Sequence, residues 1–271
     1  MNPAELQAFY DRAPDALQAD PGLPTAHHAL LAALEAGLLR AAEPDGHGGW
    51  TANVWVKQAI LAGFRATKVE AMDGPGWPFF DKTAYPARSF NLGSGVRLVP
   101  GGSSVRRGAH VAKGVVIMPP AYINVGAYVD EGTMVDSHAL VGSCAQVGKR
   151  VHLSAAAQVG GVLEPAGARP VVIEDDAFVG GLVGLFEGIL VRKRAVLASG
   201  VVITGSTVIY DLVNGREWGR EVPEDAGVVP GSRPAKGDFA AAHGLHLAAP
   251  VIVKYRDSRT DAATALEGAL R

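Results

Sequence analysis

The 271-residue chain has little of several features that mark common protein classes. Its single cysteine, Cys144, excludes an intrachain disulfide framework. Basic and acidic residues nearly balance, at 25 and 27, so no broad electrostatic attraction to nucleic acid is expected. No uninterrupted apolar run reaches membrane-spanning length, and the first residues lack the basic and apolar regions of a signal peptide. These absences predict a cytoplasmic protein that binds neither nucleic acid nor membrane.

What the chain does have is glycine, 34 residues of it, and an aliphatic residue at every sixth position over more than a hundred residues. The pattern has one interruption, and all 18 of its positions are Val, Ile or Leu, where chance would give about four or five. These positions are Val99, Val105, Val111, Ile117, Ile123, Val129, Val135, Val141, Val147, Leu153, Val159, Ile173, Val179, Leu185, Val191, Leu197, Ile203 and Ile209. Such an internal repeat decides the fold class.

A strict period of six fits neither an α-helix, with its period of 3.6, nor an ordinary strand, with its period of 2. It fits a chain that turns a corner every six residues and sends one aliphatic side chain inward from each short strand. Glycine recurs at the fourth position of the hexad, as at Gly108 and Gly114, where a tight corner needs a positive φ. Three hexads make one triangular coil, so the sequence predicts a mainly β protein with about six coils of parallel β-helix. A sandwich of ordinary strands would not keep this register.

The pattern divides the chain into three regions. They are an N-terminal helical domain and linker over residues 1–95, the β-helix over 96–211, and a C-terminal extension over 212–271. Helical spacing of apolar residues predicts helices over 3–18 and 25–42 and a third from about Val54 to Arg65.

Two further segments are predicted outside the regular repeat. Pro165 to Val172 adds eight residues to one hexad, which indicates a loop extruded at a corner. Such a loop either borders a binding groove or is a tolerated surface insertion. The extension is turn-rich over 212–248, followed by a strand over Val251–Val253 and a short helix over about 261–270.

The segment from Ile117 to Pro165 closely resembles the tetrahydrodipicolinate N-succinyltransferases, a family of hexapeptide-repeat acyltransferases. The most specific blocks are Asn124–Asp136 and Gly142–Gln146. Further matching blocks are Trp55–Leu61, Phe80–Lys82, Val96–Pro100, Val151–Ser154, Gly160–Pro165 and Val251–Lys254. The resemblance implies a left-handed coil and a homotrimer with active sites between subunits. It also implies transfer of succinyl from succinyl-CoA, as co-substrate, to the amine of ring-opened tetrahydrodipicolinate, with no permanently bound cofactor.

The resemblance assigns substrate binding to Arg97 and Asp136, and amine activation to Asp136. A carboxylate can hold the acceptor ammonium and receive its proton, and an arginine fork suits a substrate carboxylate. Without the resemblance, an aspartate at a corner is more often a turn cap and an arginine before a strand is more often solvated.

One departure from the family pattern affects the catalytic prediction. Gly184 stands where the family carries a second proposed catalytic glutamate. Glu187 is the nearest acid and is the second predicted catalytic residue. Three possibilities remain open: Glu187 serves, water and Asp136 suffice, or the acceptor differs.

For CoA, the corner glycines allow a pantetheine arm to lie close to peptide groups. The predicted cofactor-binding residues are Gly142, Gly160, Gly161, Gly180, Arg192 and Lys193. The two basic residues are placed there for the CoA phosphates, although a basic run on a surface is more often merely solvated.

Other functions are also considered. An acetyl-CoA-dependent transferase, acting on the same or an amino-sugar acceptor, would use His138 or His152 as base. A zinc site would need His110, His138 and His152, which the hexad positions do not bring together within one subunit. A non-catalytic assembly platform is the third alternative, and Cys144 is predicted to be structural rather than nucleophilic.

Overall fold

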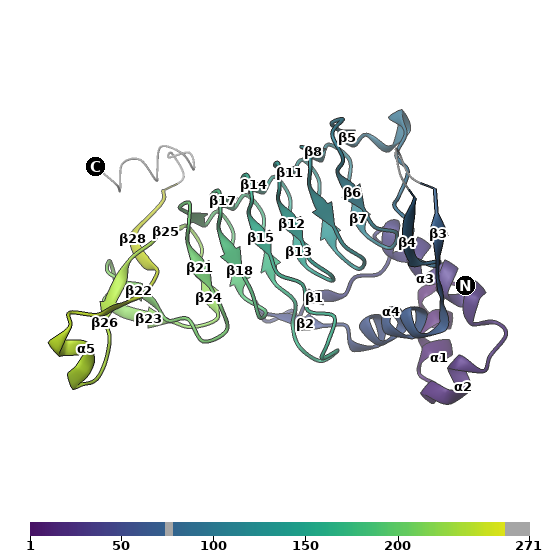
Figure 1. The fold of residues 1–271 in the computed structure, drawn as a ribbon, viewed down its shortest axis with the longest axis horizontal. Helices are drawn as coiled ribbons and strands as arrows, with labels where there is room; N and C mark the ends of the chain where they lie inside the picture. The colour runs from purple at the N-terminus through teal and green to yellow at the C-terminus, as the bar shows by residue number, and fades with distance from the viewer. Residues whose placement is uncertain (74–77, 258–271) are drawn as a thin grey trace.

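In the computed structural model the chain forms a prism of three mainly parallel sheets (Figure 1), and the structure describes residues 1–73 and 78–257. Sheet 1 holds β5 (Arg97–Leu98), β8 (Val116–Ile117), β11 (Met134–Val135), β14 (His152–Leu153), β17 (Phe178–Val179) and β20 (Val196–Leu197). Sheet 2 holds β6 (Ser104–Val105), β9 (Tyr122–Ile123), β12 (Leu140–Val141), β15 (Gln158–Val159), β18 (Gly184–Leu185) and β21 (Val202–Ile203). Sheet 3 holds β7 (His110–Val111), β10 (Tyr128–Val129), β13 (Gln146–Val147), β16 (Val172–Ile173), β19 (Leu190–Val191) and β24 (Glu221–Val222). The predicted parallel β-helix is confirmed.

Each coil pairs in register with the coils above and below it. Met134 pairs with Val116 and with His152, eighteen residues before and after it. The second residue of each coil strand from Val105 to Ile203 is at most 7% exposed, and these residues form one continuous core. The six-residue repeat is therefore the core of the prism, while the first residue of each strand faces outward.

The corners impose a left-handed backbone conformation whether or not glycine is present. The fourth hexad residue has φ between 52° and 67° at His138, Cys144, Arg150, Ala156 and Leu182. Such a conformation costs a non-glycine residue about 1–2 kcal/mol. The core packing of the coils must offset that cost, so glycine is favoured at these corners but not required.

The N-terminal helices differ in part from the prediction. The structure has α1 (Pro3–Tyr10), α2 (Pro14–Gln18), α3 (Leu23–Glu35) and α4 (Val54–Ala66). The helix expected over 3–18 is broken before Pro14, which lacks the N–H needed to continue α1. The helix expected over 25–42 ends at Glu35, because Gly37 takes a φ of 72°. The hairpin of β1 (Ala42–Pro44) and β2 (Trp50–Ala52) then begins.

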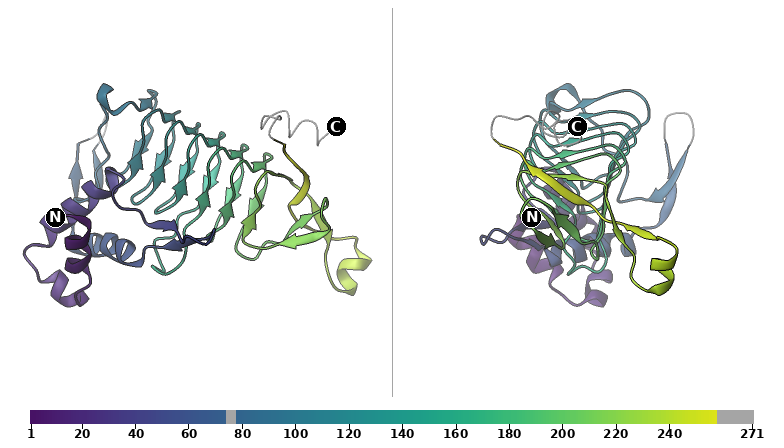
Figure 2. Two further views of the ribbon diagram at one scale, coloured as in Figure 1. Left: turned by 180° about the vertical axis from the view of Figure 1, so that it is seen from behind. Right: turned by 90° about the vertical axis from the view of Figure 1, so that its left-hand side faces the viewer.

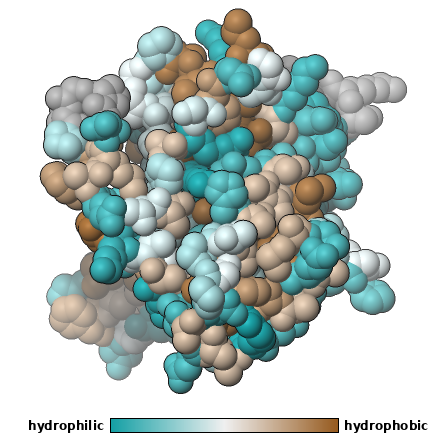
Figure 3. Space-filling view, turned by 90° about the vertical axis from the view of Figure 1, so that its right-hand side faces the viewer, coloured by the Kyte–Doolittle hydropathy of each residue, from teal (hydrophilic) through white to brown (hydrophobic). Residues whose placement is uncertain are grey.

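The helical part has its own core and packs against the prism. Leu6, Leu30 and Ile60 are fully buried there, together with Val125 and Cys144 from the coils. The hairpin of β3 (Val69–Met72) and β4 (Phe79–Lys82) and the 3₁₀ turn η1 (Leu92–Ser94) lead into the first coil. Seen from this end, hydrophilic and hydrophobic side chains are mixed over the surface (Figure 3). No helix of the described residues is long and apolar enough to cross a membrane.

The insertion leaves the prism between β15 and β16, as expected, and is held by a buried lysine. Lys57, on α4, is fully buried and donates hydrogen bonds from Nζ to the carbonyls of Pro165 (3.2 Å) and Ala168 (2.7 Å). Burial lowers the pKa of Lys57 from its usual value. The loop is thus bound to the helical domain rather than free on the surface.

The coils continue beyond residue 211. β24 pairs in parallel with β19, and β25 (Ala226–Val229) pairs in parallel with β20. The predicted strand is confirmed as β28 (Val251–Tyr255), which joins sheet 1 beside β25 and β22 (Ile209–Asp211), while β22 pairs with β23 (Arg216–Trp218). β26 (Ser232–Pro234), α5 (Asp238–Ala242) and β27 (His246–Ala248) project from this end (Figure 2). The helix predicted over 261–270 lies outside the described residues, and the three-domain division stays a proposal.

Candidate active site

Asp136 directly follows β11, at the edge where sheet 1 turns into sheet 2; we call this edge A. Its backbone N–H donates to the carbonyl of Leu153 on the next coil (2.9 Å). Its Oδ1 accepts from the N–H of Ser137 (2.7 Å), and the residue is half-buried. Within the described chain, Oδ2 accepts no hydrogen bond. The carboxylate therefore has one oxygen held by the corner and one available to a ligand.

Arg97 lies on the same sheet as Asp136. It is the outward residue of β5 and is exposed, and the pairing runs from Arg97 to Val116 and from Val116 to Met134. Two steps between strands amount to about 10 Å. Because Asp136 lies two residues beyond Met134, the Cα atoms of Arg97 and Asp136 are about 12 Å apart on this side of the prism.

His152 lies on the following coil, where it pairs with Met134, two residues before Asp136. The sequence analysis considered it as the base of the acetyl-CoA-dependent alternative and as a zinc ligand, not for this reaction. Its ring stacks on Phe178, with 4.9 Å between centroids and 9° between planes. Burial lowers the pKa of His152 from 6.5, and the charge of Asp136 opposes that shift. The offset of eighteen residues between paired strands, from Met134 to His152, is the signal that could have placed it here.

The predicted CoA-binding glycines are explained by contacts between coils. A Cβ on Gly142 would stand 2.2 Å from the N atom of Gly161, and one on Gly161 would stand 2.2 Å from the N atom of Ser143. A Cβ on Gly160 would likewise stand too close to the neighbouring coil, at 2.8 Å from the carbonyl oxygen of Leu185. These residues lie at the edge between sheets 2 and 3, away from Asp136. Packing alone requires them to be glycine.

Gly180 is the one predicted CoA-binding glycine on edge A. A Cβ there would stand 2.7 Å from the carbonyl oxygen of Leu197 and from the N atom of Ser199, so packing restricts it as well. With Ser154, Ala155 and Gly181 it gives edge A small residues on the coils that follow Asp136. Backbone groups are therefore approachable along this edge.

Glu187 does not meet Asp136 within one chain. It lies at the edge between sheets 2 and 3, where its Oε2 accepts from the N–H of Gly205 (2.9 Å) and its backbone has a φ of 55°. Its carboxylate thus caps the corner of the next coil. Gly184 lies under the ring of Phe186, so that ring covers the position of the missing glutamate.

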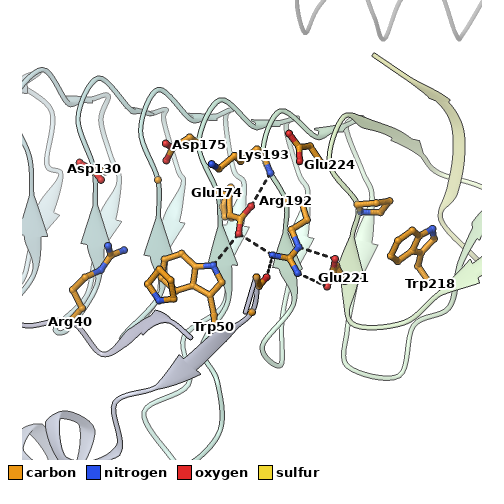
Figure 4. A pocket seen from close by; sticks show the side chains of 16 residues that line it. Arg40, Trp50, Asp130, Glu174, Asp175, Arg192, Lys193, Trp218, Glu221 and Glu224 are labelled. Carbon is orange, nitrogen blue, oxygen red and sulfur yellow. Dashed lines mark hydrogen bonds and ion pairs between the residues drawn. The ribbon is translucent and has the colours of Figure 1, made fainter. Parts of the chain in front are cut away.

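Arg192 and Lys193 lie at the third edge, in a cavity of about 790 Å³ beside the β1–β2 hairpin (Figure 4). The Arg192 guanidinium donates to both Glu221 oxygens (2.8 and 3.0 Å) and to Glu174 Oε1 (3.2 Å). Asp130, Asp175 and Glu224 also line this cavity. The guanidinium is already neutralised among acidic neighbours, so this cavity does not favour phosphate, contrary to the expectation for Arg192.

Cys144 and the histidines are placed as follows. Burial raises the pKa of Cys144 to about 12, so its thiol stays protonated at neutral pH. His110 stacks on Tyr128 in sheet 3, whereas His152 is in sheet 1 and His138 is at edge A. Across residues 1–73 and 78–257, no three His, Cys, Asp or Glu side chains gather as metal ligands would.

Comparison with known proteins identifies the family. A Polynucleobacter asymbioticus protein named 2,3,4,5-tetrahydropyridine-2,6-dicarboxylate N-succinyltransferase is 44% identical over 274 residues, covering 98% of this chain and 96% of that protein. This chain belongs to the tetrahydrodipicolinate N-succinyltransferase family. Proteins of the same name from Rhodopseudomonas palustris and Xylella fastidiosa are 47% and 44% identical, over 88% and 89% of this chain and 86% of each relative.

Two family models and a solved structure agree with membership of the N-succinyltransferase family. Residues 6–66 match the N-terminal model of tetrahydrodipicolinate N-succinyltransferase, and residues 170–205 match the hexapeptide repeat of succinyl-transferase. A Campylobacter jejuni crystal structure, described as a candidate 2,3,4,5-tetrahydropyridine-2-carboxylate N-succinyltransferase, superposes with a TM-score of 0.55 at 15% identity. That match covers 84% of this chain and 62% of the other, less than two thirds of its length, and it supports the fold alone.

Proposed function

We propose that this protein transfers succinyl from succinyl-CoA to the amine of ring-opened tetrahydrodipicolinate, giving N-succinyl-2-amino-6-oxopimelate and CoA. The observation that carries the proposal is the 44% identity along 98% of the chain to a relative of that name. The reaction belongs to the diaminopimelate route to lysine. It needs succinyl-CoA as co-substrate and no permanently bound cofactor.

The proposed site is centred on edge A. Asp136 holds the acceptor ammonium through its free carboxylate oxygen, and Arg97 binds a substrate carboxylate in a bidentate fork. The backbone near Gly180 receives the pantetheine arm. We propose no ligand role for Gly142, Gly160, Gly161 or Arg192, whose contacts are made within the chain, nor a catalytic role for Glu187. For Lys193 the phosphate role remains a proposal.

We further propose that the active protein is a cytoplasmic homotrimer with its sites between subunits. In support, the outer face of sheet 2 leaves Val202 52% exposed and Leu182, at edge A, 68% exposed. Large apolar side chains exposed at edge A and on the adjoining face of sheet 2 suit contact with a neighbouring copy. Mass determination in solution by light scattering tests this state: a mass of three chains supports it, and a monomer overturns it.

The activity is tested by mixing the purified protein with tetrahydrodipicolinate and either succinyl-CoA or acetyl-CoA, and following thiol release. Release that depends on succinyl-CoA and is abolished by Asp136→Ala supports the proposal. A preference for acetyl-CoA selects the acetyltransferase alternative. If neither donor gives thiol release, the alternatives are a different acceptor or a non-catalytic assembly platform. Because Cys144 is buried and its pKa is raised, it does not add to the thiol signal of the folded protein.

A further inference from the structure

Two histidines lie near Asp136, His138 at edge A and His152 on the outer face of sheet 1, and the structure distinguishes between them. His138 is two residues along the same corner and is exposed, with a left-handed φ of 63°. His152 is half-buried on the adjoining coil, and the N–H of Asp136 bonds the carbonyl of its neighbour Leu153. The parallel stack on Phe178 holds the plane of the His152 ring. Of the two, only His152 is held in a defined orientation.

Both ring nitrogens of His152 are available to a ligand. Among the described residues, neither of its ring nitrogens makes a hydrogen bond, whereas His110, at the same hexad position in sheet 3, bonds the carbonyl of Glu35 through Nδ1 (2.9 Å). A stacked, half-buried histidine with unpaired nitrogens, one strand away from a carboxylate and close enough for the carboxylate's charge to raise its pKa, is suited to exchange protons with a ligand. Of the predicted catalytic acids, Asp136 alone lies at edge A, since Gly184 bears no carboxylate and Glu187 caps a corner at another edge.

We propose that His152 is a further catalytic residue of this transferase and is the group that takes the proton from the acceptor amine while Asp136 holds that amine in place. The inference rests on the proposed function of edge A. It divides between two residues the work that the sequence analysis assigned to Asp136 alone. Asp136 supplies charge and orientation, and the neutral imidazole supplies the base.

The step balances without another reactant. The amine nitrogen forms a bond to the thioester carbonyl carbon, and one N–H proton passes to the free imidazole nitrogen. The C–S bond then breaks, the CoA thiolate leaves, and the imidazolium returns the proton to that sulfur. The products are the amide and CoA–SH, and His152 is neutral again.

Few charged groups lie around His152. From β11 it is faced by Met134, with Asp136 just beyond, and from β17 by Phe178. On its own coil Arg150 forms an ion pair with Asp176 at the opposite edge of sheet 1 (2.7 Å). Burial lowers the pKa of His152 and Asp136 raises it, so the imidazole is neutral at pH 7 and becomes charged only below its usual pKa of 6.5.

The test is the pH dependence of kcat/KM for His152→Gln, followed by thiol release from succinyl-CoA. His110→Gln is the matched control, because His110 is likewise half-buried and stacked on an aromatic ring, 4.3 Å from Tyr128. We expect a loss in kcat of about 100-fold or more for His152→Gln, with the acid limb of the wild-type profile removed. The control should keep both the rate and the limb.

Rescue separates catalysis from packing. Added imidazole should restore part of the activity of His152→Ala and none of the activity of Asp136→Ala. Wild-type thiol release with unchanged rate and profile in His152→Gln would overturn the inference and leave the proposed function intact. If thiol release is slower, the acid limb of the pH profile is unchanged and imidazole gives no rescue, then His152 has only a packing role and the inference is wrong. No release by the wild type would instead refute the proposed function.

Discussion

The ring of Phe186 lies over the backbone of Gly184, so that a Cβ at position 184 would stand 2.7 Å from Phe186 Cε2. A side chain at position 184 therefore cannot be accommodated unless the ring moves. The same ring approaches Gly160 on the preceding coil, where a Cβ would stand 2.8 Å from Phe186 Cδ1. Phe186 and the two glycines form one packing unit, in which a glutamate at position 184 would overlap the ring.

Gly184→Glu should therefore destabilise the protein by about 1–3 kcal/mol without increasing the rate, because the new side chain overlaps the ring. The free energy of unfolding in urea and the rate of thiol release measure both effects. In the double variant Gly184→Glu, Phe186→Ala the ring is gone, and stability should partly recover relative to the sum of the single changes. Strict additivity of the two changes would contradict the account.

Arg192→Gln should reduce stability and leave the KM for acyl-CoA unchanged, because its guanidinium binds Glu221 and Glu174 rather than a ligand. The loss should be about 1–3 kcal/mol, since Glu221 loses both hydrogen bonds from the guanidinium and Glu174 keeps only those from Trp50 and the Lys193 N–H. Steady-state kinetics and thermal unfolding of the variant measure the two quantities. A several-fold rise in the KM for acyl-CoA with unchanged stability would contradict this account and indicate that Arg192 binds CoA.

Asp211 makes stability depend on acid pH. Burial alone would raise the pKa of its carboxyl, but hydrogen bonds from Asn214, Tyr255 and Trp218 outweigh burial and hold that pKa well below the usual 3.8. Since the folded pKa is depressed, the stabilisation is complete above about pH 4 and is lost as the pH falls toward the folded pKa. Asp211→Asn should unfold at a lower temperature at pH 7, and the difference from wild type should shrink toward pH 2. The exposed Asp238→Asn is the control, with no difference expected at either pH.

Lys57→Met should release the insertion from helix α4, because Pro165 and Ala168 lose the ammonium that bonds their carbonyls. Hydrogen exchange over residues 162–169 should rise, and stability should fall by about 1–3 kcal/mol, as is usual when a buried polar contact is removed. The exposed Lys68→Met is the control. Unchanged exchange in this segment would mean that Leu163 and its apolar contacts hold the loop without Lys57.

The prism could be predicted in detail because its cause is local and periodic. Val135 and its equivalents are buried wherever the six-residue register places them, and the interruption before Ile173 is the insertion that was expected. Asp136 and Arg97 were found through blocks of residues that resemble the family. The shared sheet then follows from the coil geometry.

The roles of the other candidate site residues depended on contacts between residues far apart in the chain, which a single sequence does not display. Arg192 is basic in sequence, and only the fold places Glu221 and Glu174 around it. Gly142 and Gly161 suggested room for a ligand, but they are in close contact with each other on two neighbouring coils. His152 was considered only for the acetyltransferase and zinc alternatives, and its place near Asp136 appears only when coils eighteen residues apart are stacked. The helix predicted to reach residue 42 ends at Glu35, because Gly37 takes a left-handed φ and the segment from Ala42 pairs as a hairpin.

The most direct test of the central claim is a competition. Wild-type protein and Asp136→Ala are each given tetrahydrodipicolinate with equal concentrations of succinyl-CoA and acetyl-CoA, and the product is identified by mass spectrometry. The account predicts that the wild type forms the succinylated product in large excess and that Asp136→Ala forms neither product above the uncatalysed rate. A predominantly acetylated product, or a succinylated product formed equally well by Asp136→Ala, would contradict it.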